Sequence, residues 1–213
     1  MNNIRQFIGR AKIQLRGKNH IVGWNMMLDE AIAFFKRQGK IVLTFFGYAV
    51  SYEDEENLRK IIRHVLSKHS PARTLINYGA TIAGLGVVYP IAKSMGFTTR
   101  GIVSTVALEY PEEISPDADH ICFIADTRWG GKLPDSNELS PTSKAMVECS
   151  DILVAIGGGE ISRDELLAGK EQGKPIQYYP AEVSHAWAIE RAKRRGLPPP
   201  KSFLGAVHEV FGK

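Results

Sequence analysis

The sequence predicts an α/β protein with a Rossmann-like, doubly wound and mostly parallel sheet that has helices on both faces. Short apolar runs rich in β-branched or aromatic residues alternate along the chain with longer segments of helical period. The alternation repeats often enough to favour a parallel sheet covered on both faces. Right-handed crossovers then favour a doubly wound topology.

The first half of the chain provides three predicted helices and three predicted strands. Gly39 ends the first helix, because glycine commonly follows the last helical residue. The predicted elements are a helix at about 24–38, a strand at 40–46, a helix at 53–67, a strand at 72–77, a helix at about 84–95 and a strand at 99–104.

The second half continues the same alternation. Its predicted elements are strands at 120–125, 151–156 and 175–179 and helices at about 141–149, 162–172 and 182–195. In a doubly wound sheet ligands bind beyond the carboxyl ends of the strands, which directs attention to the loops that follow them. The segment 105–119 is expected to be a surface excursion, and 127–140 a long loop that can cover a site.

A chain of 213 residues with 44% hydrophobic residues is long enough for one sizeable core and short for two. We therefore expect a single domain over 1–213, with an N-terminal helical extension at 1–38, a core at 40–195 and a C-terminal tail at 196–213.

The composition disfavours several classes of protein. Cys122 and Cys149 lie in apolar stretches without metal or disulfide spacing, so neither a metal site nor a cofactor is expected. No run approaches the ~20 apolar residues of a membrane span, and no signal peptide is recognisable, so a cytoplasmic protein without a membrane partner is expected. The net charge of +4 is mild, and basic clusters are most often solvated faces, which makes nucleic acid an unlikely partner.

Three successive glycines are the sharpest feature of the sequence. Gly157, Gly158 and Gly159 join a buried strand to a helix predicted to begin near Ser162. Glycines let a ligand approach the backbone, and free N–H groups at a helix start favour an anion such as phosphate. The alternative is that Ser162 caps the helix and Glu165 completes a capping box, which does not account for the glycines.

Two further loops follow strands in the same predicted row. Gly79, Ala80 and Thr81 lie directly at a strand end and are candidate ligand contacts, although their spacing does not match a dinucleotide fingerprint. Gly47 follows the first strand of the core and can admit a ligand, and Ser51 in the same loop can donate to a phosphate or, alternatively, cap the next helix.

A fourth loop carries Asp126, Arg128 and Trp129 just past the strand at 120–125. A carboxylate, a guanidinium and an indole can together bind a ribose, neutralise a phosphate and stack on a base. An exposed ion pair in the loop is the alternative.

The chain resembles the SLOG superfamily of Rossmann-like proteins, which includes the lonely-guy ("lysine decarboxylase-like") proteins and DprA-like domains. Residues 79–96 look like its segment GGGxxGxMGAxxxxAxxxGG, and residues 150–165 look like the strand and turn of its PGGxGTxxE motif. The second motif places Gly158 and Gly159 on the paired glycines, Ser162 on the threonine and Glu165 on the glutamate.

The resemblance implies binding of a nucleoside monophosphate and, in the lonely-guy branch, cleavage of its N-glycosidic bond with help from that glutamate and an arginine. Ile161 replaces the last glycine of the motif, and the arginine position falls near Thr142 or Ser143. Arg128 or Arg163 can substitute for the arginine. A homodimer is also implied, with Trp24, Met27 and Phe34 as a possible contact.

Three functions follow as hypotheses. The first is binding of a nucleotide or related phosphorylated ligand, with the phosphate on Gly158, Gly159 and Ser162. The second is a nucleoside-monophosphate phosphoribohydrolase in which Glu165 is catalytic. The third is a non-catalytic interaction scaffold, because a fold does not fix a function.

Overall fold

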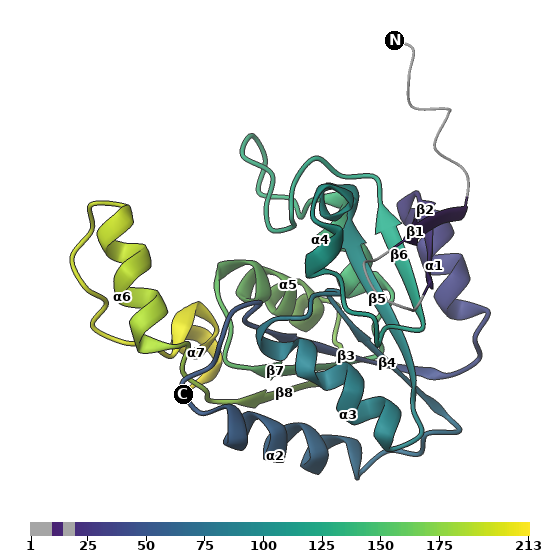
Figure 1. Cartoon of the computed structure of the whole chain (residues 1–213), viewed down its shortest axis with the longest axis horizontal. Helices are drawn as coiled ribbons and strands as arrows, with labels where there is room; N and C mark the ends of the chain where they lie inside the picture. The colour runs from purple at the N-terminus through teal and green to yellow at the C-terminus, as the bar shows by residue number, and fades with distance from the viewer. Residues whose placement is uncertain (1–9, 15–19) are drawn as a thin grey trace.

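Eight strands form one sheet in the computed structural model, which describes residues 10–14 and 20–213 (Figure 1). The strand order is β1-β2-β6-β5-β4-β3-β7-β8, and every neighbouring pair is parallel except β1 and β2. The predicted fold class is therefore confirmed. The strands are β1 (Arg10–Gln14), β2 (His20–Met26), β3 (Ile41–Gly47), β4 (Thr74–Tyr78), β5 (Thr98–Ser104), β6 (His120–Ile124), β7 (Ile152–Ile156) and β8 (Ile176–Tyr179).

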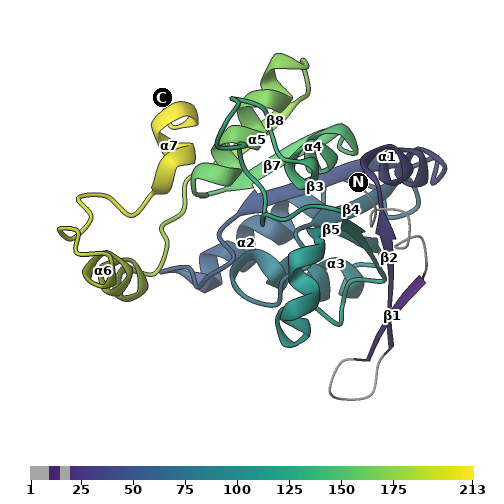
Figure 2. The same cartoon turned by 90° about the horizontal axis from the view of Figure 1, so that it is seen from above.

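Helices cover both faces of this sheet (Figure 2). Alternate residues of β3 enter different cores: Leu43 joins the core beneath α2 and α3, whereas Val42 joins the core beneath α1, α4 and α5. The helices are α1 (Leu28–Lys36), α2 (Glu55–Leu66), α3 (Val88–Ser94), α4 (Pro141–Glu148), α5 (Glu160–Glu171), α6 (His185–Arg194) and α7 (Gly205–Phe211), and the 3₁₀ turns are η1 (Gly84–Val87), η2 (Thr105–Glu109) and η3 (Pro111–Glu113). None of the helices in the described ranges is long and apolar enough to cross a membrane.

The N-terminal extension differs from the prediction of a helix at 24–38. Residues 20–26 form β2, which adds to the sheet beside β6 with Trp24 opposite Cys122. The helix begins only at Leu28, because the Glu30 carboxylate accepts a hydrogen bond from the Met27 N–H at 2.8 Å. The described part of the predicted helical extension over 1–38 is thus helical at 28–36 and forms strands at 10–14 and 20–26, while residues 1–9 and 15–19 lie outside the described residues.

The chain reverses direction across the sheet between β3 and β7. After β3 it steps outward through β4, β5 and β6, and it then crosses back to place β7 on the other side of β3. Where the strand order reverses, the loops at the carboxyl ends of the two strands lead in opposite directions and leave a crevice in which open α/β sheets bind ligands. In this chain the loops at that switch point follow Gly47 and Ile156.

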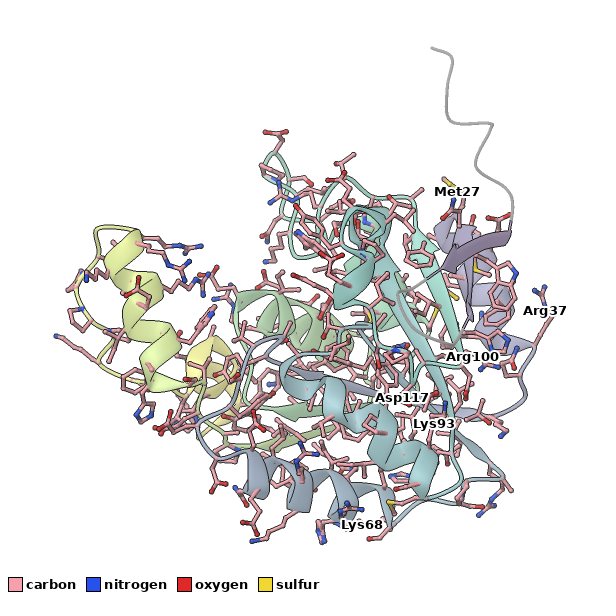
Figure 3. All side chains as sticks on the ribbon, viewed as in Figure 1. Met27, Arg37, Lys68, Lys93, Arg100 and Asp117 are labelled. Carbon is pink, nitrogen blue, oxygen red and sulfur yellow. The ribbon has the colours of Figure 1, made fainter. Side chains whose placement is uncertain are left out.

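The segment 105–119 packs against the loop after β4 and against α3. Its Ser115 N–H donates to the Ala80 carbonyl at 2.8 Å, and its Glu113 carbonyl accepts from the Ile82 N–H at 2.9 Å. Figure 3 shows Lys93 of α3 beside Asp117, and their charged atoms are 4.0 Å apart. The predicted surface excursion is therefore attached both to α3 and to the loop after β4.

Candidate functional site

Helix α5 begins two residues earlier than the sequence suggests. Gly159 is the residue that precedes its first turn, and the helix runs from Glu160 to Glu171. Ser162 therefore lies inside the first turn and is not the cap, so the predicted capping box with Glu165 is wrong. Instead the Ser162 hydroxyl donates to the Gly47 carbonyl at 3.2 Å, which ties α5 to the end of β3.

Protein atoms fill the space beside Gly157 and Gly158. Gly157 has φ +58° and Gly158 has φ +129°, both in the region that favours glycine. A Cβ on Gly157 would lie 2.6 Å from the Ala181 carbonyl oxygen, and one on Gly158 would lie 2.8 Å from Val207 Cγ2. Packing within the chain thus requires glycine at two of the three positions.

Gly47 is constrained in the same way at the end of β3. A Cβ there would lie 2.8 Å from both the Ile156 carbonyl oxygen and Leu85 Cδ2. The predicted ligand contact at Gly47 is untested, but close packing alone accounts for this glycine.

Gly159 differs from its two neighbours because no atom lies within 4 Å of a Cβ built on it. Within the described part of the chain, the N–H groups of Glu160, Ile161 and Ser162 donate to no protein group. The N-terminus of α5 therefore has three N–H groups without a protein acceptor and the positive end of a helix dipole, next to a glycine with free space on its Cβ side.

Helix α7 fixes the orientation of the peptide that enters α5. The Val207 N–H donates to the Gly158 carbonyl at 3.2 Å. In a trans peptide the C=O and the following N–H point in opposite directions, so this bond directs the Gly159 N–H away from α7. Val207 is fully buried by the contact.

Glu165 is a buried carboxyl group on the second turn of α5, and its side chain is part of a short hydrogen-bond chain. The Ser143 hydroxyl donates to Glu165 Oε1 at 2.6 Å and accepts from the Gly131 N–H at 2.7 Å. Burial raises the pKa of Glu165 to about 8, the bond from Ser143 lowers it, and the charge of Asp164 adds to the rise. Glu165 is thus mostly protonated at neutral pH.

Thr142 and Ser143 lie near the position where the family resemblance expects an arginine. The nearby cations do not replace it: Lys144 pairs with Glu138 at 2.8 Å, and Arg163 pairs with Asp164 at 2.9 Å. Among the described residues no cation forms an ion pair with Glu165. Sequence reasoning missed Ser143 as a partner of Glu165, and the only available signal was its place in the motif comparison.

In the loop after β4, both backbone groups of Ala80 already form hydrogen bonds within the protein. The Ala80 N–H donates to the Tyr89 hydroxyl at 3.1 Å, and the Ala80 carbonyl accepts from Ser115. The Thr81 hydroxyl is placed to donate to the Tyr78 hydroxyl at 3.4 Å or to the Ala83 carbonyl at 3.3 Å, while Gly79 has free space on its Cβ side. Of the three predicted contacts here, Gly79 and Thr81 retain groups that can face a ligand.

The Asp126 carboxylate accepts hydrogen bonds from two backbone N–H groups, one of them at the start of α4. It accepts from the Thr142 N–H at 2.9 Å and from the Arg128 N–H at 3.0 Å. Asp126 therefore caps the helix, whereas the Arg128 side chain is exposed. Each carboxylate oxygen keeps a further lone pair, so a ribose contact by Asp126 stays a prediction.

All predicted site residues lie at the carboxyl ends of β3, β4, β6 and β7 or in the first two turns of α5. A cavity of about 350 Å³ lies to one side, and none of the predicted site residues lines it; its lining includes Leu58, Arg59, Ile82, Gly84 and Val87. In the described ranges no group of three or more His, Cys, Asp or Glu side chains is placed to hold a metal ion.

No family model and no curated protein sequence matches the chain. Among solved structures it is similar to the molybdenum cofactor carrier protein of Chlamydomonas reinhardtii, with 20% identity, a TM-score of 0.46 and coverage of 65% of this chain and 76% of that one. The molybdenum cofactor binding protein of Rippkaea orientalis gives 16% identity, a TM-score of 0.47 and the same two coverages.

The chain is also similar to DNA processing protein A of Streptococcus pneumoniae, with 10% identity and a TM-score of 0.45. This match covers 86% of this chain and 63% of that one. At such identities and scores the likeness concerns the arrangement of strands and helices and not the ligand.

Proposed function

We propose that the chain binds a nucleotide or a related phosphorylated ligand at the switch point between β3 and β7. The observation that carries this proposal is the N-terminus of α5, where the N–H groups of Glu160, Ile161 and Ser162 have no protein acceptor and the neighbouring Gly159 has free space on its Cβ side. An anion there gains charge-assisted hydrogen bonds and the helix dipole. The phosphate contact centres on Gly159, since protein atoms occupy the space beside Gly157 and Gly158.

A pair of substitutions at Gly159 tests this proposal. Gly159 has ordinary extended dihedral angles and free space, so both alanine and aspartate fit there. Aspartate is also a favoured residue before a helix, so the protein is expected to remain folded. Its carboxylate occupies the α5 donors and repels phosphate, whereas alanine does neither.

The measurement is thermal unfolding against nucleoside mono-, di- and triphosphates, cyclic nucleotides and ADP-ribose. A ligand at 100 times its dissociation constant stabilises a native protein by roughly 2.7 kcal/mol. We expect such a shift in the wild-type protein and in Gly159→Ala, and its loss in Gly159→Asp. No shift with any compound would favour the scaffold hypothesis, and an undiminished shift in Gly159→Asp would place the phosphate elsewhere.

A second candidate function is a nucleoside-monophosphate phosphoribohydrolase. The specific observation in its favour is the buried Glu165, whose pKa of about 8 keeps a proton available for a leaving base. We expect free base to be released from a monophosphate substrate and Glu165→Gln to abolish the release. Purine and pyrimidine monophosphates are tested at concentrations that saturate the protein. Release of no free base from any of them would contradict this function.

The implied homodimer also remains a proposal. Trp24 stacks on His120 at 4.9 Å and contacts Phe34 at 5.4 Å, so both rings are engaged within the chain. Met27, at 50% exposure, is the most available of the three expected contact residues. Light scattering is expected to return a dimer at micromolar concentration, and a monomer would contradict the proposal.

A further inference from the structure

The positive charge of the chain is concentrated in α6 and the loop that follows it. With histidine counted as neutral, residues 185–201 hold five basic residues and one acidic residue, a net charge of +4 that equals the net charge of the whole chain. The acidic residue, Glu190, pairs with Arg194 at 3.8 Å. The rest of the chain is therefore balanced in charge, and the positive field is local. The five basic residues are all exposed: Arg191, Lys193, Arg194, Arg195 and Lys201.

Helix α6 projects from one end of the molecule. Figures 1 and 2 both show it at the margin, apart from the sheet. Its start is joined to the body, because the Ser184 N–H donates to the Ser51 carbonyl at 2.9 Å. Its inner side is buried at Ala188 and Ala192. The basic residues in its last turn therefore lie on a projecting part of the surface.

The turn that ends α6 holds an apolar side chain in solvent. Gly196 has φ +66°, and its N–H donates to the Lys193 carbonyl at 3.0 Å. The Leu197 N–H donates to the Ala192 carbonyl at 2.9 Å, which completes a Schellman motif. In this motif the residue after the glycine usually packs on one of two helix residues, which here are Ala192 and Arg191. Neither offers a large apolar side chain, and Leu197 is 57% exposed.

A second apolar residue is exposed one turn before Lys193. Ile189 is 44% exposed, and residues four positions apart lie on the same side of a helix. Basic and apolar side chains are therefore presented together at the end of α6. We call this surface the α6 tip, and it consists of Ile189, Lys193, Arg194, Arg195 and Leu197.

An anionic lipid surface is the partner that uses both features of the α6 tip. Nucleic acid supplies phosphates for the basic residues but leaves Ile189 and Leu197 without a role. A protein partner fits less well, because stable interfaces bury about 800 Å² on each side and the tip is one turn of helix and its cap. Anionic headgroups attract lysine and arginine, and apolar side chains enter the boundary between headgroups and acyl chains.

We propose that the α6 tip docks the protein on an anionic membrane surface, with its basic residues on the headgroups and Ile189 and Leu197 at the headgroup–acyl boundary. Docking of this kind needs no helix that spans the bilayer, and none in the described ranges is long and apolar enough to do so. The expectation of no membrane partner rests on the lack of a spanning segment, which does not apply to a helix that lies on the surface. The docking is also independent of the phosphate site, since no residue of the tip belongs to it.

Vesicle flotation with the full-length chain tests the proposal. Vesicles of phosphatidylcholine alone are compared with vesicles that contain about 30% phosphatidylserine. One variant combines Arg194→Gln with Arg195→Gln, and its matched control combines Arg59→Gln with Arg63→Gln, which removes the same charge from exposed residues of α2. The other variant is Leu197→Ser, and its control is Ile82→Ser, because Ile82 has a similar exposure of 52%. Thermal unfolding verifies that each variant is folded.

We expect the wild-type chain to bind the phosphatidylserine vesicles at least about tenfold more tightly than the neutral ones. One basic residue near such a surface contributes about fivefold, so the double arginine variant is expected to bind about 25-fold more weakly. Leu197→Ser is expected to weaken binding about threefold or more, and both controls to change it less than about twofold.

Equal binding of the two kinds of vesicle, or no binding to either, would overturn the proposal. So would a loss in the controls that matches the loss in the tip variants, or unchanged binding in Leu197→Ser. Fluorescence anisotropy with a DNA duplex of about 20 base pairs tests the main alternative. Duplex binding that requires Arg194 and Arg195 but not Leu197, without a preference for anionic vesicles, would assign the tip to nucleic acid instead.

Discussion

Replacement of Gly158 by alanine is expected to lower the free energy of unfolding by about 3 kcal/mol or more. Two costs combine in this variant. A residue with a Cβ is strained at φ +129°, and the new methyl group lies 2.8 Å from Val207 Cγ2 and 3.0 Å from Ser162 Cβ. Urea unfolding at 25 °C, followed by circular dichroism, measures the change.

Gly159→Ala is the matched control for this prediction. Gly159 is the next residue, its φ is −89°, and no atom lies within 4 Å of the added Cβ. We expect its free energy of unfolding to change by less than about 1 kcal/mol. Equal losses in the two variants would contradict the distinction between a packed Gly158 and an open Gly159, on which the placement of the phosphate depends.

Glu165→Gln is expected to stabilise the protein at high pH. The pKa of Glu165 rises from its ordinary value of 4.5 to about 8 in the folded state, mainly through burial. The native state therefore holds a proton that the unfolded state has lost, and stability falls as the pH rises from about 4.5 to about 8. Each pKa unit corresponds to about 1.4 kcal/mol, so the full cost is roughly 4 to 5 kcal/mol.

Glutamine occupies nearly the same volume, can accept the Ser143 hydrogen bond and does not ionise. We therefore expect the wild-type protein and Glu165→Gln to differ by less than about 1 kcal/mol at pH 5, and the variant to be more stable by several kcal/mol at pH 9. Urea unfolding between pH 5 and 9 measures both. A difference that does not change with pH would mean that the Glu165 carboxyl is solvated and ordinary.

Most of the fold follows from local sequence patterns. The strands of the core begin and end within two residues of the prediction, because short apolar runs are bounded by glycine, proline or polar residues. The start of α5 at Glu160 could not be predicted in this way, since Ser162 and Glu165 have the spacing of a capping box but both lie inside the helix. The segment 20–26 was also missed, because its strand character depends on pairing with β6, a hundred residues away.

The sequence pattern also predicts where the candidate site lies, but it does not predict which residues pack against the site glycines or pair with Glu165. Strand ends followed by glycines predict a site at the carboxyl edge of the sheet, and that location stays a prediction. The partners that decide the role of each glycine come from distant segments: Val207 and Ala181 pack on the glycine turn, and Ser143 pairs with Glu165. No spacing rule connects such residues, because tertiary packing brings them together.

The most direct test of the phosphate site is a nuclear magnetic resonance titration of the ¹⁵N-labelled full-length chain with AMP and with ribose 5-phosphate. We predict that the amide signals of Gly159, Glu160 and Ile161 shift together and saturate with both compounds. The Gly157 amide, which donates to the Tyr179 carbonyl at 2.9 Å, is predicted to move less. Binding that shifts signals elsewhere while these three amides stay unchanged would contradict a phosphate site at the start of α5.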